Sequence, residues 1–156
     1  MDETKTLKVG DLAPDFVLKD QNNNDVHLSS FKGRRVLLSF HPLAWTPVCA
    51  RQMGSLEKHA DAFQALKTVP LGMSIDHVPC KYAWAKSLLI KKTALAADFW
   101  PHGAVAKLYG LFREPDGFTE RANIIVDENR RVSFIKIYEL SELPDIREIL
   151  AFLKKS

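Results

Sequence analysis

The chain has 156 residues, of which 46% are hydrophobic and 26% charged. These values are ordinary for a globular protein and exclude a disordered, collagen-like or coiled-coil chain. The net charge of +3 comes with no basic block or stripe, so no nucleic-acid partner is implied. We expect one domain over residues 1–156, long enough to bury its own core.

Cysteine content and hydropathy indicate a cytoplasmic protein with no membrane partner. No segment approaches the roughly 18 consecutive apolar residues of a membrane span. The first ten residues lack an apolar stretch of signal-peptide length. Cys49 and Cys80 are the two cysteines, which is too few for a disulfide framework. Reduced thiols in an intracellular protein are therefore the expected state.

The N-terminal part of the chain predicts a hairpin, a buried strand and a helix. Residues 15–18 and 26–28 flank a polar, Asn-rich loop and are expected to pair as short strands. Residues 36–41 form an almost wholly apolar run, typical of a strand covered on both faces. From residues 48 to 67, apolar side chains recur at helical spacing, which predicts one amphipathic helix.

The middle of the chain predicts a second core strand and two helices. Residues 69–75 are apolar and strand-like. The following segment, residues 79–91, is expected to be a helix with Pro79 in its first turn. A shorter helix over residues 104–109 is expected to end at Gly110.

The last elements define the fold class. Residues 123–126 and 132–138 are β-rich and predict a hairpin, and Pro144 is expected to open a final amphipathic helix. The order predicts an α/β fold with a mixed central sheet and helices on both faces. This layout resembles the thioredoxin-like fold with an N-terminal β-hairpin extension.

The loop over residues 42–49, P-L-A-W-T-P-V-C, carries the strongest chemical signal. It leaves the end of a buried strand and enters a helix, the usual place for a site in an α/β sheet. Cys49 falls in the first helical turn, where free N–H groups and the helix dipole favour a thiolate. Thr46 occupies the position where a dithiol oxidoreductase would carry a second cysteine. Dithiol exchange is therefore excluded at this loop.

Pro42, Thr46 and Cys49 form the pattern Pro-x-x-x-Thr-x-x-Cys, which resembles the active-site signature of the peroxiredoxins. The resemblance covers nearly the whole chain. Further motifs similar to those of the family follow in order: V-G-D-L-A-P-D-F (residues 9–16), D-F-W-P-H-G-A-V (98–105) and R-A-N-I-I-V-D (121–127). The second of these resembles the one-cysteine branch typified by alkyl hydroperoxide reductase E.

The resemblance implies a thiol-dependent peroxidase that reduces hydrogen peroxide, organic hydroperoxides or peroxynitrite without a cofactor or metal. It makes Cys49 the peroxidatic cysteine, which becomes a sulfenic acid. It implies that Thr46 hydrogen-bonds the peroxide, that Pro42 shields the sulfur, and that Arg121 holds a positive charge beside it. It also implies a homodimer, and recycling by Cys80 or by an external thiol or thioredoxin-like reductant.

The role of Cys80 stays open at this stage. It lies near the predicted start of the helix after the second core strand, and related chains place a resolving cysteine in several locations, including this helix. A disulfide with Cys49 requires Cα atoms within about 7 Å, which would require local unwinding. The alternative is a structural cysteine. His77 lies three residues earlier, but two candidate ligands do not make a zinc site.

Three positions depart from the family pattern. Gln52 stands where Glu is common, which leaves open how Arg121 is held. His41 replaces an aromatic residue beside the active-site proline and could affect the local charge near neutral pH. Lys81 stands where a His often precedes the helix tryptophan, Trp84.

Less specific interpretations remain for these residues. Cys49 could be a buried apolar cysteine in an interaction module or holdase, and a peroxide sensor is a further alternative. Thr46 could also act as a helix N-cap. Core packing is the expected use of most of the three tryptophans. Leu43, Trp45 and Trp84 are candidates for an exposed apolar dimer contact.

Overall fold

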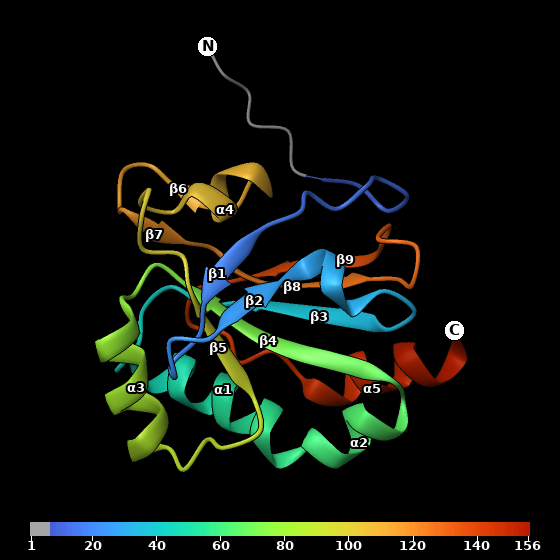
Figure 1. Ribbon diagram of the computed structural model, residues 1–156, viewed down its shortest axis with the longest axis horizontal. Coiled ribbons are helices and arrows are strands. Elements are labelled where there is room, and N and C mark those ends of the chain that lie inside the picture. The colour runs from blue at the N-terminus through green and yellow to red at the C-terminus, as the bar shows by residue number, and fades with distance from the viewer. Residues whose placement is uncertain (1–6) are drawn as a thin grey trace.

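A computed structural model describes residues 7–156 of the chain (Figure 1). Its centre is a seven-stranded mixed sheet with the strand order β2-β1-β5-β4-β3-β8-β9. The three inner strands β3, β4 and β5 run parallel, and the pairs β1–β2, β1–β5, β3–β8 and β8–β9 are antiparallel. The strands of this sheet are β1 (Val17–Lys19), β2 (Asp25–His27), β3 (Arg35–Phe40), β4 (Thr68–Ser74), β5 (Ala94–Ala97), β8 (Arg121–Val126) and β9 (Val132–Tyr138).

Helices cover both faces of the sheet, as the sequence predicted. In Figure 1, α1, α2 and α5 lie below the sheet and α4 lies above it. A small hairpin, β6 (Phe112–Arg113) with β7 (Phe118–Thr119), follows α4. The helices are η1 (Leu28–Phe31), α1 (Pro47–Lys58), α2 (Ala60–Ala65), α3 (Val78–Ser87), α4 (Ala104–Leu108) and α5 (Ile146–Lys155). None of those within residues 7–156 is long and apolar enough to cross a membrane.

Two separate apolar cores hold the layers together. Successive side chains of β3 point to opposite faces of the sheet, as strand geometry requires. Leu37 packs with residues of α1, α2, α3 and α5, whereas Val36 and Leu38 pack with α4 and the N-terminal segment. Because β3 is covered on both faces, its apolar run does not alternate with polar residues, which explains why it was recognisable in the sequence.

The helix predicted over residues 48–67 is wrong in one respect, because it is two helices. α1 ends at Lys58, and His59 leaves helical geometry with φ −103° and ψ 18°. The His59 ring Nδ1 lies 2.9 Å from the Ser55 carbonyl oxygen, at the last turn of α1. The change of direction after His59 leads into α2, whose Phe63 is fully buried.

Several other boundaries differ from those expected. The N-terminal strands lie at 17–19 and 25–27, and α3 ends at Ser87 rather than at residue 91 because Leu89 has a left-handed φ of 56°. The last helix begins at Ile146, after Pro144, because the Asp145 carboxylate accepts a hydrogen bond from the Arg147 N–H at 3.0 Å and caps it.

The strand β5 was not recognised in the sequence. Its four residues, A-L-A-A, have little intrinsic β-propensity. The strand exists because Leu71 to Ser74 of β4 pair with it in parallel, and because Lys19 of β1 pairs with Ala97 on its other side.

Candidate active site

Cys49 lies at the start of α1, where the sequence placed it. The loop after β3 begins at His41, and Trp45 takes a left-handed φ of 68° just before the helix. Few residues other than glycine adopt this conformation, so the entry into α1 is a constrained turn. Thr46 is the N-cap residue, and Cys49 is the third residue of the helix with no exposed surface. The N–H groups of the first helical turn have no partner within the helix and favour negative charge nearby.

Arg121 is the other charged component of the site. It opens β8, whose next residue, Ala122, pairs with Phe40 at the end of β3. This register carries Arg121 to the edge of the sheet where the Cys49 loop begins. Its side chain is 3% exposed, and its Nη1 lies 3.3 Å from the Cys49 Sγ. The structure thus joins two predicted residues that are 72 positions apart.

The guanidinium group of Arg121 is held by neutral acceptors. Its Nε and Nη2 donate to the Leu140 carbonyl at 3.0 and 2.7 Å, and its Nη1 donates to the Gln52 Oε1 at 2.7 Å. The Gln52 amide donates in turn to the Ser39 Oγ at 2.8 Å and the Phe40 carbonyl at 3.1 Å. Gln52 therefore orients Arg121 through both ends of its amide, which answers how Arg121 is held without a Glu.

The charge of Arg121 has no carboxylate to balance it. Among residues 7–156, no salt bridge joins Arg121 to an acidic side chain. A buried cation without a counter-ion is strongly unfavourable. Cys49 is the group in hydrogen-bond contact that can supply a negative charge, as a thiolate. Arg121 and Cys49 thus form a buried contact in which a thiolate would balance the charge of the guanidinium group.

Thr46 and Pro42 belong to the loop between β3 and α1. The Thr46 hydroxyl donates to the Leu43 carbonyl at 2.7 Å and makes no capping bond to the helix. Because its proton is committed, its oxygen remains an acceptor. Pro42, Thr46 and Arg121 line a hollow of about 240 Å³, and Cys49 is not among its lining residues. Arg121 thus reaches both the hollow and the buried sulfur.

Cys80 is the third residue of α3 and is partly exposed. Burial, and then the negative charge of Asp76, raise the pKa of the Cys80 thiol. Its Sγ lies 4.0 Å from the Asp76 Oδ1. Cys49 and Cys80 are both free thiols in the structure. His77 packs edge-on against Phe99 at 4.5 Å, and within the described chain no three His, Cys, Asp or Glu side chains gather as a metal site.

His41 and the tryptophans correct three expectations. Burial, and then the charges of Lys81 and Arg121, hold the pKa of His41 well below its usual value, so its ring is neutral and adds no charge near neutral pH. Trp84 is 1% exposed and packs against the His41 ring at 5.3 Å, so it is not a surface contact. Trp45 and Trp100 are exposed, which contradicts a core role for most of the tryptophans.

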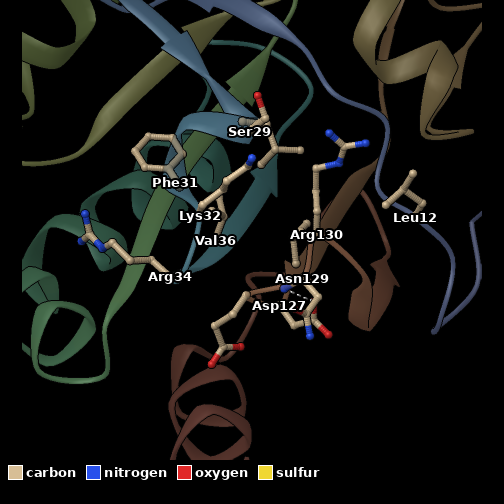
Figure 2. Close-up of a pocket in the computed structure, with 12 residues that line it drawn as sticks. Leu12, Ser29, Phe31, Lys32, Arg34, Val36, Asp127, Asn129 and Arg130 are labelled. Carbon is tan, nitrogen blue, oxygen red and sulfur yellow. Dashed lines mark hydrogen bonds between the residues drawn. The ribbon is translucent and has the colours of Figure 1, made fainter.

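A second hollow lies away from Cys49 (Figure 2). It has a volume of about 350 Å³ and shares no lining residue with the hollow beside Arg121. Val36, near the beginning of β3, and Arg130, in the turn before β9, belong to its wall. Cys49 follows the opposite end of β3, so the two hollows lie near opposite ends of that strand.

Of the two groups that hold Arg121, one had no signal in the sequence and the other had a partial one. The Leu140 acceptor is a backbone carbonyl, which any residue type supplies. Gln52 gave a partial signal because it lies three residues after Cys49, on the same side of the helix. Its partner Ser39 is fixed by a further hydrogen bond to the Asn123 Oδ1 at 2.8 Å, across β3 and β8.

A buried thiol at a helix N-terminus, facing an arginine on a mixed α/β sheet, defines a class of thiol-based redox proteins. The chain belongs to the AhpC/TSA family, whose family model matches residues 9–135. It is 37% identical to alkyl hydroperoxide reductase E of Mycobacterium bovis over 142 residues, 90% of this chain and 92% of that protein. It is 33% identical to peroxiredoxin 2 of Thermoplasma acidophilum over 151 residues, 94% of this chain and 74% of that protein.

Solved structures agree with this assignment. The reduced 2-Cys peroxiredoxin of Plasmodium vivax matches with a TM-score of 0.86 and 29% identity, over 94% of this chain and 80% of that one. The peroxidoxin BcpB of Mycobacterium tuberculosis matches with a TM-score of 0.83 and 25% identity, over 96% of this chain and 97% of that one. The predicted thioredoxin-like α/β fold and the resemblance to peroxiredoxins are confirmed.

Proposed function

We propose that this chain is a thiol-dependent peroxidase that reduces hydrogen peroxide, organic hydroperoxides or peroxynitrite at Cys49. The observation that carries the proposal is the 3.3 Å contact between the Arg121 Nη1 and the Cys49 Sγ, in a site where none of the described carboxylates pairs with Arg121. This arrangement supports a thiolate, which is the nucleophilic form of cysteine. Family membership supports the same activity.

In the proposed reaction, the Cys49 thiolate attacks one oxygen of the peroxide. A sulfur–oxygen bond forms as the oxygen–oxygen bond breaks. The leaving group is hydroxide or alkoxide, which takes a proton from solvent to become water or an alcohol, or, from peroxynitrite, nitrite. The peroxide is reduced and the sulfur is oxidised to sulfenic acid. Arg121 and the first-turn N–H groups stabilise the negative charge that moves to the leaving oxygen. The Thr46 oxygen accepts a hydrogen bond from a peroxide O–H, and the buried Pro42 limits access of water to the sulfur.

Recycling requires a thiol that attacks the sulfenic sulfur, which forms a disulfide and releases water. A further external thiol reduces that disulfide if it was formed with an external thiol, whereas a disulfide between Cys49 and Cys80 requires two external thiols or one dithiol. Cys80 or an external thiol, including a thioredoxin-like reductant, can perform the first step. Mass spectrometry of the intact protein after peroxide treatment separates the two routes. Loss of two hydrogens per chain supports Cys80, and gain of one oxygen supports an external thiol.

Location and assembly belong to the same proposal. Two free thiols suit a reducing cytoplasm. A homodimer is supported by the exposed Trp45 beside the active-site loop, because large exposed apolar side chains often mark contacts between proteins. Sedimentation of the wild type and of Trp45→Ser tests the dimer: the variant is expected to shift toward monomer.

The activity is tested by following peroxide consumption in Cys49→Ser and in Cys80→Ser as the matched control. We expect Cys49→Ser to consume no peroxide, and Cys80→Ser to react with one equivalent at the wild-type rate. The same experiment excludes an interaction module or holdase in which the cysteine is incidental. If Cys49→Ser consumes peroxide as fast as the wild type, the proposed function is wrong.

A further inference from the structure

Lys81 is a fully buried lysine whose ammonium group has no hydrogen-bond partner in the described part of the chain. It lies in α3 with no exposed surface, and its Nζ has no hydrogen-bond acceptor among the described residues. Lysine is almost never fully buried unless it is paired, because an ammonium group loses its hydration inside a protein. A buried ammonium group without an acceptor lowers the stability of the fold, so its presence calls for an explanation in terms of the groups around it.

The position of Lys81 in its helix places it on the face of α3 that meets the apolar cluster containing Cys49. Residues three and four positions further on lie on the same helical face, and these are Trp84 and Ala85. Both pack in one apolar cluster with Cys49, whereas the neighbouring Cys80 packs at the edge of that cluster. Lys81 therefore lies on the face of α3 that packs into the apolar cluster containing Cys49.

Titratable groups from several elements act on this ammonium. Burial lowers the pKa of Lys81 to about 8, against the negative charges of Asp76, Cys80, Cys49 and Asp98, which raise it. These groups come from the segment before α3, from α3 itself, from α1 and from the segment after β5. His41, in the loop after β3, is a further neighbour, since the charge of Lys81 lowers the pKa of its ring.

The two carboxylates in this set are already committed to other donors. The Asp76 Oδ2 accepts hydrogen bonds from the Ala44 N–H at 2.8 Å and from Ser74 Oγ at 2.7 Å. Asp98 accepts from two N–H groups at the start of α4, at 3.0 and 2.9 Å. His41 is neutral and cannot balance the charge. Cys49 is thus the member of the set whose charge changes during the proposed reaction, from thiolate to neutral sulfenic acid.

We propose that Lys81 is a positioning residue that stabilises the Cys49 thiolate as a second buried positive charge, in addition to Arg121. The proposal rests on the proposed function of Cys49. It needs no direct contact, because charges interact over several ångströms in an interior shielded from water. The pH dependence has a definite sign: Lys81 supports the thiolate when protonated, and this support is lost as the pH rises through about 8.

The first experiment replaces Lys81 by methionine and compares Lys86→Met, the same change at an exposed position of α3. Both are made in a Cys80→Ser background, and the rates of peroxide reduction and of Cys49 alkylation are measured against pH. In Lys81→Met we expect the alkylation profile to move up by about one pH unit, as for removal of one nearby opposite charge. The pH at which the peroxide rate reaches its plateau is expected to move up by the same amount in Lys81→Met and to stay in place in Lys86→Met.

Folding does not confound this comparison. Replacing a buried, unpaired ammonium group by an apolar side chain of similar length is expected to raise Tm rather than lower it. A lysine with only a structural role would change Tm and leave the pH profiles where they are. If both profiles of Lys81→Met coincide with those of Lys86→Met, the proposal is overturned.

A second measurement does not depend on activity. The NMR shift of the Lys81 Cε is followed against pH in the wild type and in Cys49→Ser. Because coupling between two charges is reciprocal, loss of the thiolate should move the Lys81 titration to lower pH. An unchanged titration contradicts the proposal even if Cys49→Ser is inactive. If Cys49→Ser retains peroxidase activity instead, the proposed function fails, and the Lys81 titration still reports whether the two groups are coupled.

Discussion

Replacing Arg121 by methionine tests the electrostatic argument for the site most directly. The change keeps an unbranched apolar stem of similar reach but removes the guanidinium group, whose Nη1 lies 3.3 Å from the Cys49 Sγ. Removing one preorganised donor from a developing negative charge typically lowers a rate by about 10²–10³. We therefore expect the second-order rate constant for hydrogen peroxide at neutral pH to fall at least about 100-fold.

The same change has a calculable effect on folding. The Leu140 carbonyl loses both of its Arg121 donors, and the Gln52 Oε1 loses one at 2.7 Å. The Gln52 Oε1 is buried, and a buried acceptor left without a donor costs about 1–3 kcal/mol in the free energy of unfolding. The Leu140 carbonyl is only partly buried, so water can replace its donors at a smaller cost. Urea denaturation measures this loss. Arg121→Lys, which keeps the charge but not the planar fork, should be intermediate in rate.

The assay follows the reaction of the reduced protein with peroxide by stopped flow, under conditions in which every variant is folded. Arg113→Met is the matched control, because Arg113 is paired with Asp116 and Glu120 in the small hairpin, and does not contact Cys49. It should react at the wild-type rate. A rate for Arg121→Met within about threefold of the wild type, well short of the loss expected for a missing donor, would refute the reasoning.

Two further predictions concern the loop and the sheet beneath it. Thr46→Val removes the hydroxyl that donates to the Leu43 carbonyl, and should slow peroxide reduction about tenfold or more. Because this hydroxyl does not cap α1, Tm should change little; Thr46→Ser should restore the rate, and an equally slow Ser variant contradicts the role. Gly72→Ala puts a methyl group 2.7 Å from the Leu95 Cδ2 and against the Met53 Sδ, and should cost about 1–3 kcal/mol by overpacking. Urea denaturation measures it, and an unchanged midpoint would show that α1 moves freely on β4.

The placement of Cys49 in the first turn of a helix after β3 could be predicted because its signals are local. An apolar run bounded by proline, followed by apolar residues at helical spacing, indicates a strand entering a helix wherever it occurs. The short strand β5 could not be predicted in this way, because four residues rich in alanine become a strand only when β4 and β1 pair with them.

The burial of Trp84 and Lys81 in α3 could not be predicted from the sequence, for a different reason. Trp84 was a candidate for an exposed contact, and Lys81 had no interpretation beyond its departure from the family pattern. In the structure both are fully or almost fully buried on the same helical face. A lysine on a helix is ordinarily exposed, so its burial follows from how α3 lies over the sheet and not from its own preference.

The amino-acid sequence by itself predicted Cys49 as the candidate nucleophile and the helix-entry turn that holds it, and its motifs over residues 9–127 indicated the family. The position of Cys49 was predictable because it depends on residues within about two helical turns of one another, the range over which backbone preferences act. The tertiary structure alone decided how Arg121 is held, by the Gln52 amide and the Leu140 carbonyl, and that Lys81 is enclosed near Cys49. Such contacts depend on the register of β8 against β3 and on the packing of α3, because only these bring distant segments within hydrogen-bonding or Coulombic range.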